Sequence, residues 1–378
     1  MITKASEIHL KHTALIRPSY GDFGRLELGI LGAPCAIIRQ YAERWTASLS
    51  NKWAVAYVDA DHKQFNQSGT TASLLYHDRI GHRQIDLKKA STPFTNRVLF
   101  NDQDLVFING NHFKAKKQVL IIHPDKPMDK KLEKLTDVAL VLLADGMEVP
   151  ALIKEHLKGL DLPVLALNDD VTIVKFLNKF LDSAIAPLHG LVLAGGKSTR
   201  MHSDKGNIEY HGKTQREYTY HLLSAFCGEV FISGKNESGL KTIEDVFVGL
   251  GPYGGILSAM LHNPNVAWLT VACDLPYLSA KTLEYLVALR NPSKLATCFL
   301  DSDGEFPEPL VTIWEPRAYP VLLQFLSQGY SCPRKVLINS DIELLNAPDA
   351  GEFKNVNSPE ERDAALKYFS SISLSGSL

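Results

Sequence analysis

The stretch AGGKSTRMHSDK, from Ala194 to Lys205, contains the residues of this chain best suited to binding an anion. Its paired glycines, Gly195 and Gly196, allow backbone N–H groups to approach a ligand closely. Arg200 and Lys205 add positive charge, and the hydroxyl side chains nearby are further hydrogen-bond donors. The spacing matches neither GxGxxG nor GxxxxGKS/T. The composition predicts a phosphate-binding turn, with an ordinary tight turn carrying solvated charges as the alternative.

Asp274 is the second candidate, because it comes just after the apolar run 268–273. The glycine turn also follows an apolar run, 188–193, and open α/β sheets bind ligands at the carboxyl ends of their parallel strands. We therefore expect the carboxylate and the turn to share one crevice. A single carboxylate together with nucleotide phosphates is a usual way to hold Mg²⁺. The alternative role for Asp274 is to cap a helix that follows Pro276.

Asp245 and a glycine-rich segment lie between these two features. Asp245 follows a short predicted strand, where its carboxylate is able to accept a hydrogen bond from a ribose hydroxyl. Gly251 and Gly255 belong to the segment GLGPYGG, which we expect to form a loop over a flat base. A helix from Ile256 is then expected to direct its N-terminal N–H groups toward the site. Simple turns are the alternative explanation for these glycines.

Apolar runs that alternate with amphipathic segments would position these residues. Near-continuous Val, Ile and Leu suit parallel strands that are covered by helices on both faces. The sequence therefore predicts an α/β protein with two three-layer domains. The expected strands cover 26–30, 53–58, 104–110, 118–123, 138–145, 162–167, 188–194, 229–233 and 268–273, and the clearest helices cover 171–183 and 215–226.

The 378 residues suit two domains. We expect the boundary between Ser183 and Pro187, because the proline ends a helical pattern and a new strand starts at Leu188. The first domain is then 1–184 and the second is 187–370. The Ser-rich residues 371–378 are expected to be a disordered tail.

The composition limits the partners of the chain. With 40 basic and 42 acidic residues, the net charge of -2 provides no general attraction to nucleic acid or to an anionic membrane. The five cysteines have no CxxC or metal-type spacing, which is typical of reduced thiols. We see no signal-peptide pattern at the N-terminus and no apolar run near the ~20 residues of a membrane span. We therefore expect a cytoplasmic protein without nucleic-acid or membrane partners.

Several motifs of the second half occur in a characteristic order: LVLAGGKSTRM with DKG, then IED, GPYGGI, ACDLPYL and FKNVNSPEE. In this order they resemble the molybdenum cofactor guanylyltransferase family, over residues 187–369. The glycine turn alone is shared with other nucleotidyltransferases, whereas GPYGGI and FKNVNSPEE favour the molybdopterin branch. The resemblance implies a Rossmann-like nucleotidyltransferase domain that binds GTP and Mg²⁺.

The resemblance also implies roles for individual positions. Lys205, Arg200 and Asp274 would be the catalytic residues, and Asp274 would also hold Mg²⁺. The residues expected to contact the nucleotide are Leu193, Ala194, Gly195, Gly196, Lys205, Ser233, Asp245, Gly251 and Gly255. The residues expected on the pterin side are Arg334, Asn355 and Asn357.

The implied reaction is transfer of GMP from GTP to the terminal phosphate of molybdopterin, with release of pyrophosphate. Both reactants are anions, so charge repulsion is the main obstacle, and a metal cation and basic side chains offset it. PYGG, where the family has PLAG, leaves other substrates open: CTP with molybdopterin, or a sugar or alcohol phosphate as acceptor. A non-catalytic cofactor carrier is a further alternative, against which Lys205 and Asp274 argue. Cofactor-delivering proteins and client molybdoenzymes are the expected protein partners.

The first half begins with a strand–turn–helix pattern, LELGILGAPCAIIRQYAERW. When the phosphate-loop pattern is laid on Gly29, the positions that need Gly, Lys and Ser or Thr fall on Pro34, Cys35 and Ala36. With DLVFING and LPVLALND, residues 25–181 resemble the molybdopterin-guanine dinucleotide biosynthesis adapter family, a P-loop GTP-binding partner of the guanylyltransferase. The resemblance implies a P-loop-like domain with a degenerate Walker A motif. We expect weak or no GTP binding, no hydrolysis and a structural role.

Overall fold

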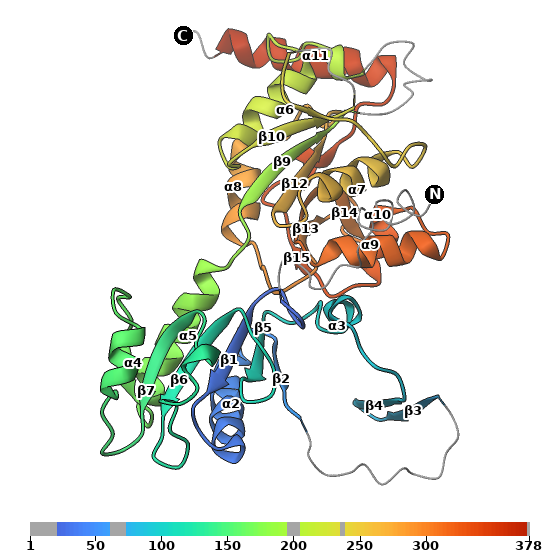
Figure 1. Ribbon diagram of the computed structural model, residues 1–378. Coiled ribbons are helices and arrows are strands. Elements are labelled where there is room, and N and C mark those ends of the chain that lie inside the picture. The colour runs from blue at the N-terminus through green and yellow to red at the C-terminus, as the bar shows by residue number, and fades with distance from the viewer. Residues whose placement is uncertain (1–20, 61–72, 195–204, 235–238, 376–378) are drawn as a thin grey trace, which may run out of the picture. The chain divides into compact units, whose positions relative to one another are not determined.

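The computed structural model describes residues 21–60, 73–194, 205–234 and 239–375 (Figure 1). The chain divides into two compact units, Met1–Ala184 and Ile185–Leu378. Each unit has its own central sheet with apolar clusters on both faces, so each has a three-layer α/β architecture. No helix in the described segments is both long enough and apolar enough to span a membrane.

The first unit is built on a six-stranded sheet in which all neighbouring strands are parallel. Its strands are β1 (Glu27–Leu31), β2 (Val55–Val58), β5 (Leu105–Asn109), β6 (Lys117–Ile122), β7 (Val138–Leu143) and β8 (Val164–Ala166). The order across the sheet is β2-β5-β1-β6-β7-β8. Every residue of β1 and β5 is buried, because these strands are covered on both faces.

Helices cover both faces of this sheet. The unit contains α2 (Cys35–Leu49), α3 (Pro93–Leu99), η1 (Leu132–Lys134), α4 (Ala151–His156) and α5 (Asp170–Ser183), and a separate hairpin of β3 (Leu74–Arg79) and β4 (His82–Leu87). α2 and α5 cover one face, where Trp45 and Leu177 are buried with Phe107. α4 covers part of the other face through Ile153. The apolar pattern did not predict the hairpin.

The turn between β1 and α2 consists of Gly32, Ala33 and Pro34. Gly32 has a φ of 89°, and a Cβ atom there would lie 2.2 Å from the carbonyl oxygen of Ile121, so the tight packing against β6 requires glycine. Gly29 lies inside β1 and is paired with both β5 and β6. The first positions of the phosphate-loop pattern laid on Gly29 therefore lie in β1, and only Gly32, Ala33 and Pro34 of the pattern lie in the turn.

The second unit is built on a seven-stranded mixed sheet. Its strands are β9 (Leu188–Leu193), β10 (Val230–Ser233), β11 (Thr242–Ile243), β12 (Ala267–Ala272), β13 (Ala296–Leu300), β14 (Pro307–Trp314) and β15 (Glu343–Leu345). The order is β11-β10-β9-β12-β14-β13-β15. β11, β10, β9 and β12 are parallel neighbours, whereas β14 is antiparallel to β12 and β13. In the sequence, no pattern distinguishes the antiparallel strand β14 from the parallel strands of this sheet.

Helices again cover both faces of this sheet. They are α6 (Gln215–Ser224), α7 (Pro252–His262), α8 (Ala280–Ala288), α9 (Ala318–Ser327), α10 (Pro333–Ile338) and α11 (Pro359–Ser375), with short helices η2 (Lys205–Asn207) and η3 (Ala350–Phe353). α7, α9 and α10 pack on one face and α6 and α8 on the other. α11 runs to Ser375 and so extends into the segment 371–378, for which the sequence predicted a disordered tail. Residues 376–378 lie outside the described part.

Candidate functional site

The glycine turn begins at the edge of the second unit's sheet at which Asp274 also lies. β9 and β12 are paired in parallel as far as Leu193 and Ala272, and the N–H of Cys273 donates to the carbonyl oxygen of Leu193 at 3.2 Å. Ala194 follows directly after Leu193, and Asp274 follows Cys273, the residue after Ala272. This edge is the carboxyl end of β9 and β12, where open α/β sheets bind ligands.

The beginning of the glycine turn is only partly described. Leu193 is buried and Ala194 is half-buried, whereas Gly195, Gly196 and Arg200 lie outside the described residues. Lys205 is described through its backbone alone, as the first residue of η2. The structure therefore locates both ends of the turn and leaves the roles expected for its middle as predictions.

Ser233, Asp245 and Gly255 converge beside Leu193. The Ser233 hydroxyl donates to Oδ1 of Asp245 at 2.7 Å, and this bond joins the end of β10 to the segment after β11. A Cβ atom on Gly255 would lie 2.7 Å from Ser233 Oγ and 3.0 Å from Leu193 Cδ2. Because a side chain at Gly255 would collide with both, only glycine allows α7 to lie this close to the two strand ends.

The GLGPYGG segment differs from the predicted loop, because α7 begins at Pro252 rather than at Ile256. Gly251 is the N-cap residue and has a φ of 57°, a conformation that favours glycine. Gly255 is therefore inside the helix, and its role is close packing rather than loop closure. Proline at the first helical position is a recognised start signal that could have placed this boundary correctly.

Ser258 was not among the predicted site residues, although it holds the Asp245 segment in place. Its hydroxyl accepts hydrogen bonds from the N–H groups of Val246, at 3.0 Å, and Phe247, at 3.4 Å, and donates to the carbonyl oxygen of Gly254 at 2.7 Å. Ser258 is almost completely buried. A serine in an apolar helix gives no sign of its partners in sequence, because the partners are backbone groups of another segment.

Asp274 is connected to the NVNSPEE segment. The N–H of Val356 donates to the backbone carbonyl oxygen of Asp274 at 3.0 Å, which brings the neighbouring Asn355 to this edge of the sheet. The side-chain oxygen of Asn355 is buried and accepts no hydrogen bond from the described residues. Asn357 is exposed, and its N–H donates to Glu361 at the start of α11. Of the two predicted pterin-side asparagines, both of which flank Val356, Asn355 has the buried side-chain oxygen.

Arg334, the third residue predicted on the pterin side, contacts two buried carboxylates. Its guanidinium lies 3.3 Å from Asp301 Oδ2 and 3.6 Å from Glu308 Oε2. Burial raises the pKa of Glu308. The hydrogen bond from the N–H of Leu310 and the charge of Arg334 oppose this rise, and the charges of Asp301 and Asp274 add to it. Asp301 and Glu308 were not predicted, because their burial follows from β14 lying between β12 and β13.

Arg216 is a further residue that the sequence analysis missed. It is buried at the start of α6, and a Cβ atom on Gly206 would lie 2.9 Å from its Nη2 atom. Thr214 and Glu217 form a capping box at this end of α6. The Thr-x-x-Glu spacing is readable in the sequence and predicts the start of the helix. It does not predict that Gly206 packs against Arg216.

The oxygen groups of this segment suit a hard divalent cation. Asp274 supplies a carboxylate and the Asn355 side chain an amide oxygen, and Mg²⁺ prefers oxygen ligands of this kind. Within the described ranges, no group of three or more His, Cys, Asp or Glu residues could hold a metal ion by itself. Burial raises the pKa of nearby Tyr210 to about 12, and the charge of Asp274 contributes to this increase.

Together, the fold and the site define an α/β nucleotide-binding domain with a polar cluster and a carboxylate at the carboxyl edge of its parallel strands. Residues 190–342 match the family model described as MobA-like NTP transferase domain. The chain is 31% identical over 183 residues to the molybdenum cofactor guanylyltransferase of Xanthomonas euvesicatoria pv. vesicatoria, which covers 46% of this chain and 92% of the relative. The chain therefore belongs to the molybdenum cofactor guanylyltransferase family.

Two other similar proteins are matched over different shares of their own length. The chain is 37% identical over 187 residues to a molybdenum cofactor biosynthesis bifunctional protein of Synechocystis sp., covering 48% of this chain and 54% of that relative. This chain thus spans about half the length of the bifunctional relative. A crystal structure of molybdopterin-guanine dinucleotide biosynthesis protein A from Archaeoglobus fulgidus is 19% identical with a TM-score of 0.40, and covers 49% of this chain and 99% of that structure.

Proposed function

We propose that this protein transfers GMP from GTP to the terminal phosphate of molybdopterin, releasing pyrophosphate and forming the guanine dinucleotide cofactor. Membership of the guanylyltransferase family supports this reaction class. The structural observation that supports it most directly is the convergence of Ser233, Asp245 and Gly255 beside Leu193. These are residues expected to contact the nucleotide, and they come from four separate segments of the second unit.

In this proposal the cluster binds the nucleoside. Asp245 accepts a hydrogen bond from a ribose hydroxyl, and the Ser233 hydroxyl holds its carboxylate in position. Gly255 lets α7 pack closely against Ser233 and Leu193, and Gly251 begins this helix beside the nucleoside, while the backbone of Leu193 and Ala194 contacts the base. Gly195 and Gly196 are assigned to the phosphates. The predefined orientation of Asp245 reduces the conformational entropy that GTP binding has to overcome.

The chemistry needs no covalent intermediate. The acceptor phosphate attacks the α-phosphorus of GTP in line, and the domain contributes orientation and positive charge. Lys205 and Arg200 are assigned to stabilising the negative charge that develops on the phosphates. Mg²⁺ would be held by Asp274 together with the nucleotide phosphates, and when bound it supplies further charge neutralisation.

The acceptor, molybdopterin, is assigned to the side of Asp274 away from the nucleotide. The hydrogen bond from the N–H of Val356 to the Asp274 carbonyl oxygen connects the segment of Asn355 to Asp274. The buried side-chain oxygen of Asn355 is able to accept hydrogen bonds from the amino and ring N–H groups of a pterin. Asn357 and Arg334 are assigned to the same side. Arg334 is already balanced by two carboxylates, so we expect it to contribute shape and hydrogen bonds more than net positive charge.

The first unit is assigned a structural role as a degenerate adapter domain. Its β1–α2 turn offers neither the lysine nor the hydroxyl that a phosphate loop uses. We infer that it holds cofactor-delivering proteins or client molybdoenzymes, and that GTP binds in the second unit.

A direct assay tests the proposal. Purified full-length protein is incubated with GTP, Mg²⁺ and molybdopterin, and the dinucleotide product is quantified by chromatography. We expect product with GTP and little with CTP or UTP at the same concentration. Preferred turnover with another nucleotide, or with a sugar phosphate as the acceptor, would overturn the substrate assignment. No turnover with any pair, despite GTP binding, would favour a cofactor carrier.

A further inference from the structure

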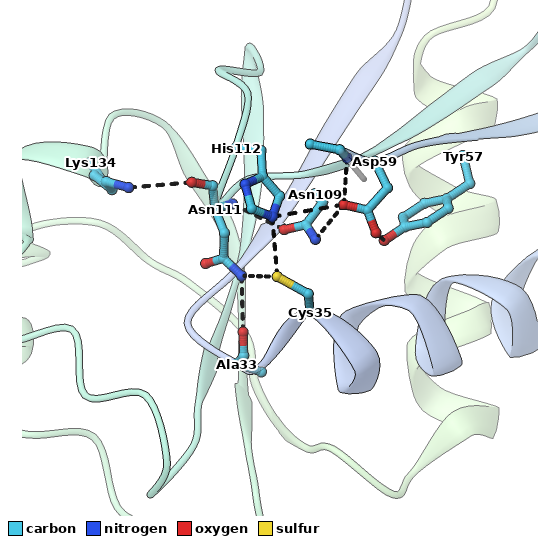
Figure 2. A network of polar contacts seen from close by, with 9 residues as sticks. Ala33, Cys35, Tyr57, Asp59, Asn109, Asn111, His112 and Lys134 are labelled. Carbon is cyan, nitrogen blue, oxygen red and sulfur yellow. Dashed lines mark hydrogen bonds and ion pairs between the residues drawn. The ribbon is translucent and has the colours of Figure 1, made fainter. Parts of the chain in front are cut away.

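Cys35 and His112 form a close pair in the first unit, far apart in sequence and outside the site described above. The Sγ atom of Cys35 lies 3.2 Å from Nε2 of His112 (Figure 2). Cys35 is the first residue of the 15-residue helix α2, and His112 follows the end of β5. Both therefore lie at the carboxyl edge of the six-stranded sheet. The imidazole is close enough to accept the thiol proton directly.

Hydrogen bonds hold this pair in place (Figure 2). Asn111 Nδ2 donates to the carbonyl oxygen of Ala33 at 3.0 Å and to Cys35 Sγ at 3.6 Å. Asp59 Oδ1 lies 3.9 Å from His112 Nε2, within the distance of an ion pair when the imidazole carries a second proton. Asn109 Nδ2 donates to the same Asp59 oxygen at 2.8 Å, which fixes the carboxylate.

Positive groups lie near the sulfur. Cys35 lies at the N-terminus of α2, where the helix dipole stabilises a negative charge. Lys126 interacts electrostatically with Cys35: burial lowers the pKa of the lysine, Cys35 raises it, and Lys131 and Lys134 lower it. Lys134 also donates to the carbonyl oxygen of Asn111. The half-buried sulfur of Cys35 therefore lies near Lys126, and Lys131 and Lys134 lie near that lysine.

The other four cysteines provide an internal comparison. Burial raises the pKa values of Cys227 and Cys298 to about 12, so these two thiols stay protonated. Cys273 is buried, which restricts its access to reagents. Cys332 is exposed, more so than Cys35, and is the appropriate reference for accessibility. A reaction that is controlled by exposure alone would therefore favour Cys332.

We propose that Cys35 and His112 form a nucleophilic thiol–imidazole pair that undergoes disulfide exchange with small anionic disulfides. This modification site is independent of guanylyl transfer. Cys35 occupies the position at which the phosphate-loop pattern would require lysine, so a thiol replaces the charged amine there.

The exchange balances without another oxidant. His112 takes the proton from Cys35, and the thiolate attacks one sulfur of the disulfide. The original S–S bond breaks while a new S–S bond joins Cys35 to that half of the reagent. The departing thiolate receives the proton from the His112 imidazolium and leaves as a thiol. Lys126, Lys131 and Lys134 would attract the carboxylates of an anionic reagent, which gives the site its preference for negative charge.

The test uses full-length protein with glutathione disulfide, which is anionic, and cystamine, which is cationic. Peptide mapping by mass spectrometry measures the rate of mixed-disulfide formation at each cysteine. We expect Cys35 to react with glutathione disulfide faster than Cys332. His112→Gln should lower the rate of mixed-disulfide formation at Cys35 at least ~10-fold, because the general base is lost. Lys126→Ala should slow the reaction with glutathione disulfide more than the reaction with cystamine.

Matched variants exclude trivial explanations. His156→Gln removes another histidine of the same unit, and Lys154→Ala removes an exposed lysine, and neither should change the rate at Cys35. Circular dichroism of each variant checks that the fold is retained. Faster modification of Cys332 than of Cys35, or an unchanged rate in folded His112→Gln, would overturn the thiol–imidazole pair. Equal effects of Lys126→Ala on both reagents would overturn the anionic preference.

Discussion

Ser233 donates a hydrogen bond of 2.7 Å to Oδ1 of Asp245 at the carboxyl ends of the parallel strands in the second unit. The two residues are separated by 12 positions in the chain, and Gly255 of α7 packs against the serine hydroxyl. This contact orients a carboxylate that we assign to the nucleoside. The first two predictions test this cluster.

Ser233→Ala should weaken GTP binding without abolishing it. A hydrogen bond of this kind contributes about 1 kcal/mol, which corresponds to about a fivefold increase in Kd. Asp245→Asn should weaken binding more, because it changes the group assigned to the ribose. Isothermal titration calorimetry measures both. Ser224→Ala, which removes an exposed hydroxyl on α6, is the control. An unchanged Kd in Asp245→Asn would argue against this location for the nucleoside.

Gly255→Ala should lower both stability and GTP affinity. The added methyl group would collide with Ser233 Oγ and Leu193 Cδ2, and overpacking of this kind costs about 1–3 kcal/mol. For a domain of this size we expect the melting temperature to fall by about 3 °C or more. Gly228→Ala is the matched control, because its nearest neighbour would be 3.8 Å away. Equal melting temperatures for the two variants would contradict the close packing at Gly255.

Asp274→Ala should reduce guanylyl transfer by at least ~10²-fold, which is typical for the loss of one charge-stabilising group. Lys205→Ala should have an effect of similar size. Raising the Mg²⁺ concentration should partly restore Asp274→Asn if the carboxylate contributes to cation affinity. Initial rates over a Mg²⁺ titration provide the measurement. Asp303→Ala removes an exposed carboxylate and should keep full activity. Near-normal rates in folded Asp274→Ala would remove this residue from the mechanism.

Glu308 should make stability fall as pH rises. Burial raises its pKa above the ordinary value of 4.5, so the folded state binds the proton more tightly than the unfolded state. The resulting stabilisation is present below that ordinary value and is lost as pH rises through the folded pKa. Glu308→Gln keeps an acceptor for the N–H of Leu310 and removes the titration. Melting temperatures from pH 4 to 7 should therefore decline less in the variant, and parallel curves would contradict this origin.

Calorimetric titration of the full chain should show one GTP per chain. The β1–α2 turn has no lysine, Gly29 lies within β1, and Pro34 offers no N–H to a phosphate. Asp245→Ala should therefore remove most of the binding heat. A second GTP that persists in Asp245→Ala, accompanied by phosphate release, would show that the first unit retains a functional nucleotide site.

Much of the fold was predictable because hydrophobic periodicity acts locally. The run from Leu188 to Leu193 predicted β9, and the run before Asp274 predicted β12. The rule that parallel strands end at one edge then placed Asp274 beside Ala194. The boundary of α7 was predicted less well. The glycines suggested a loop, but the proline start and the packing at Gly255 favour a helix.

The sequence by itself determined the two α/β units, the apolar strands and the residue types available for phosphate chemistry, because these depend on spacing along the chain. Only the tertiary structure decided which polar groups meet. Ser233 with Asp245, Arg334 with Glu308, and Cys35 with His112 are brought together by strand order and helix packing. No local pattern encodes such pairs, since a side chain finds its partner only after the sheet has set the distance between remote segments.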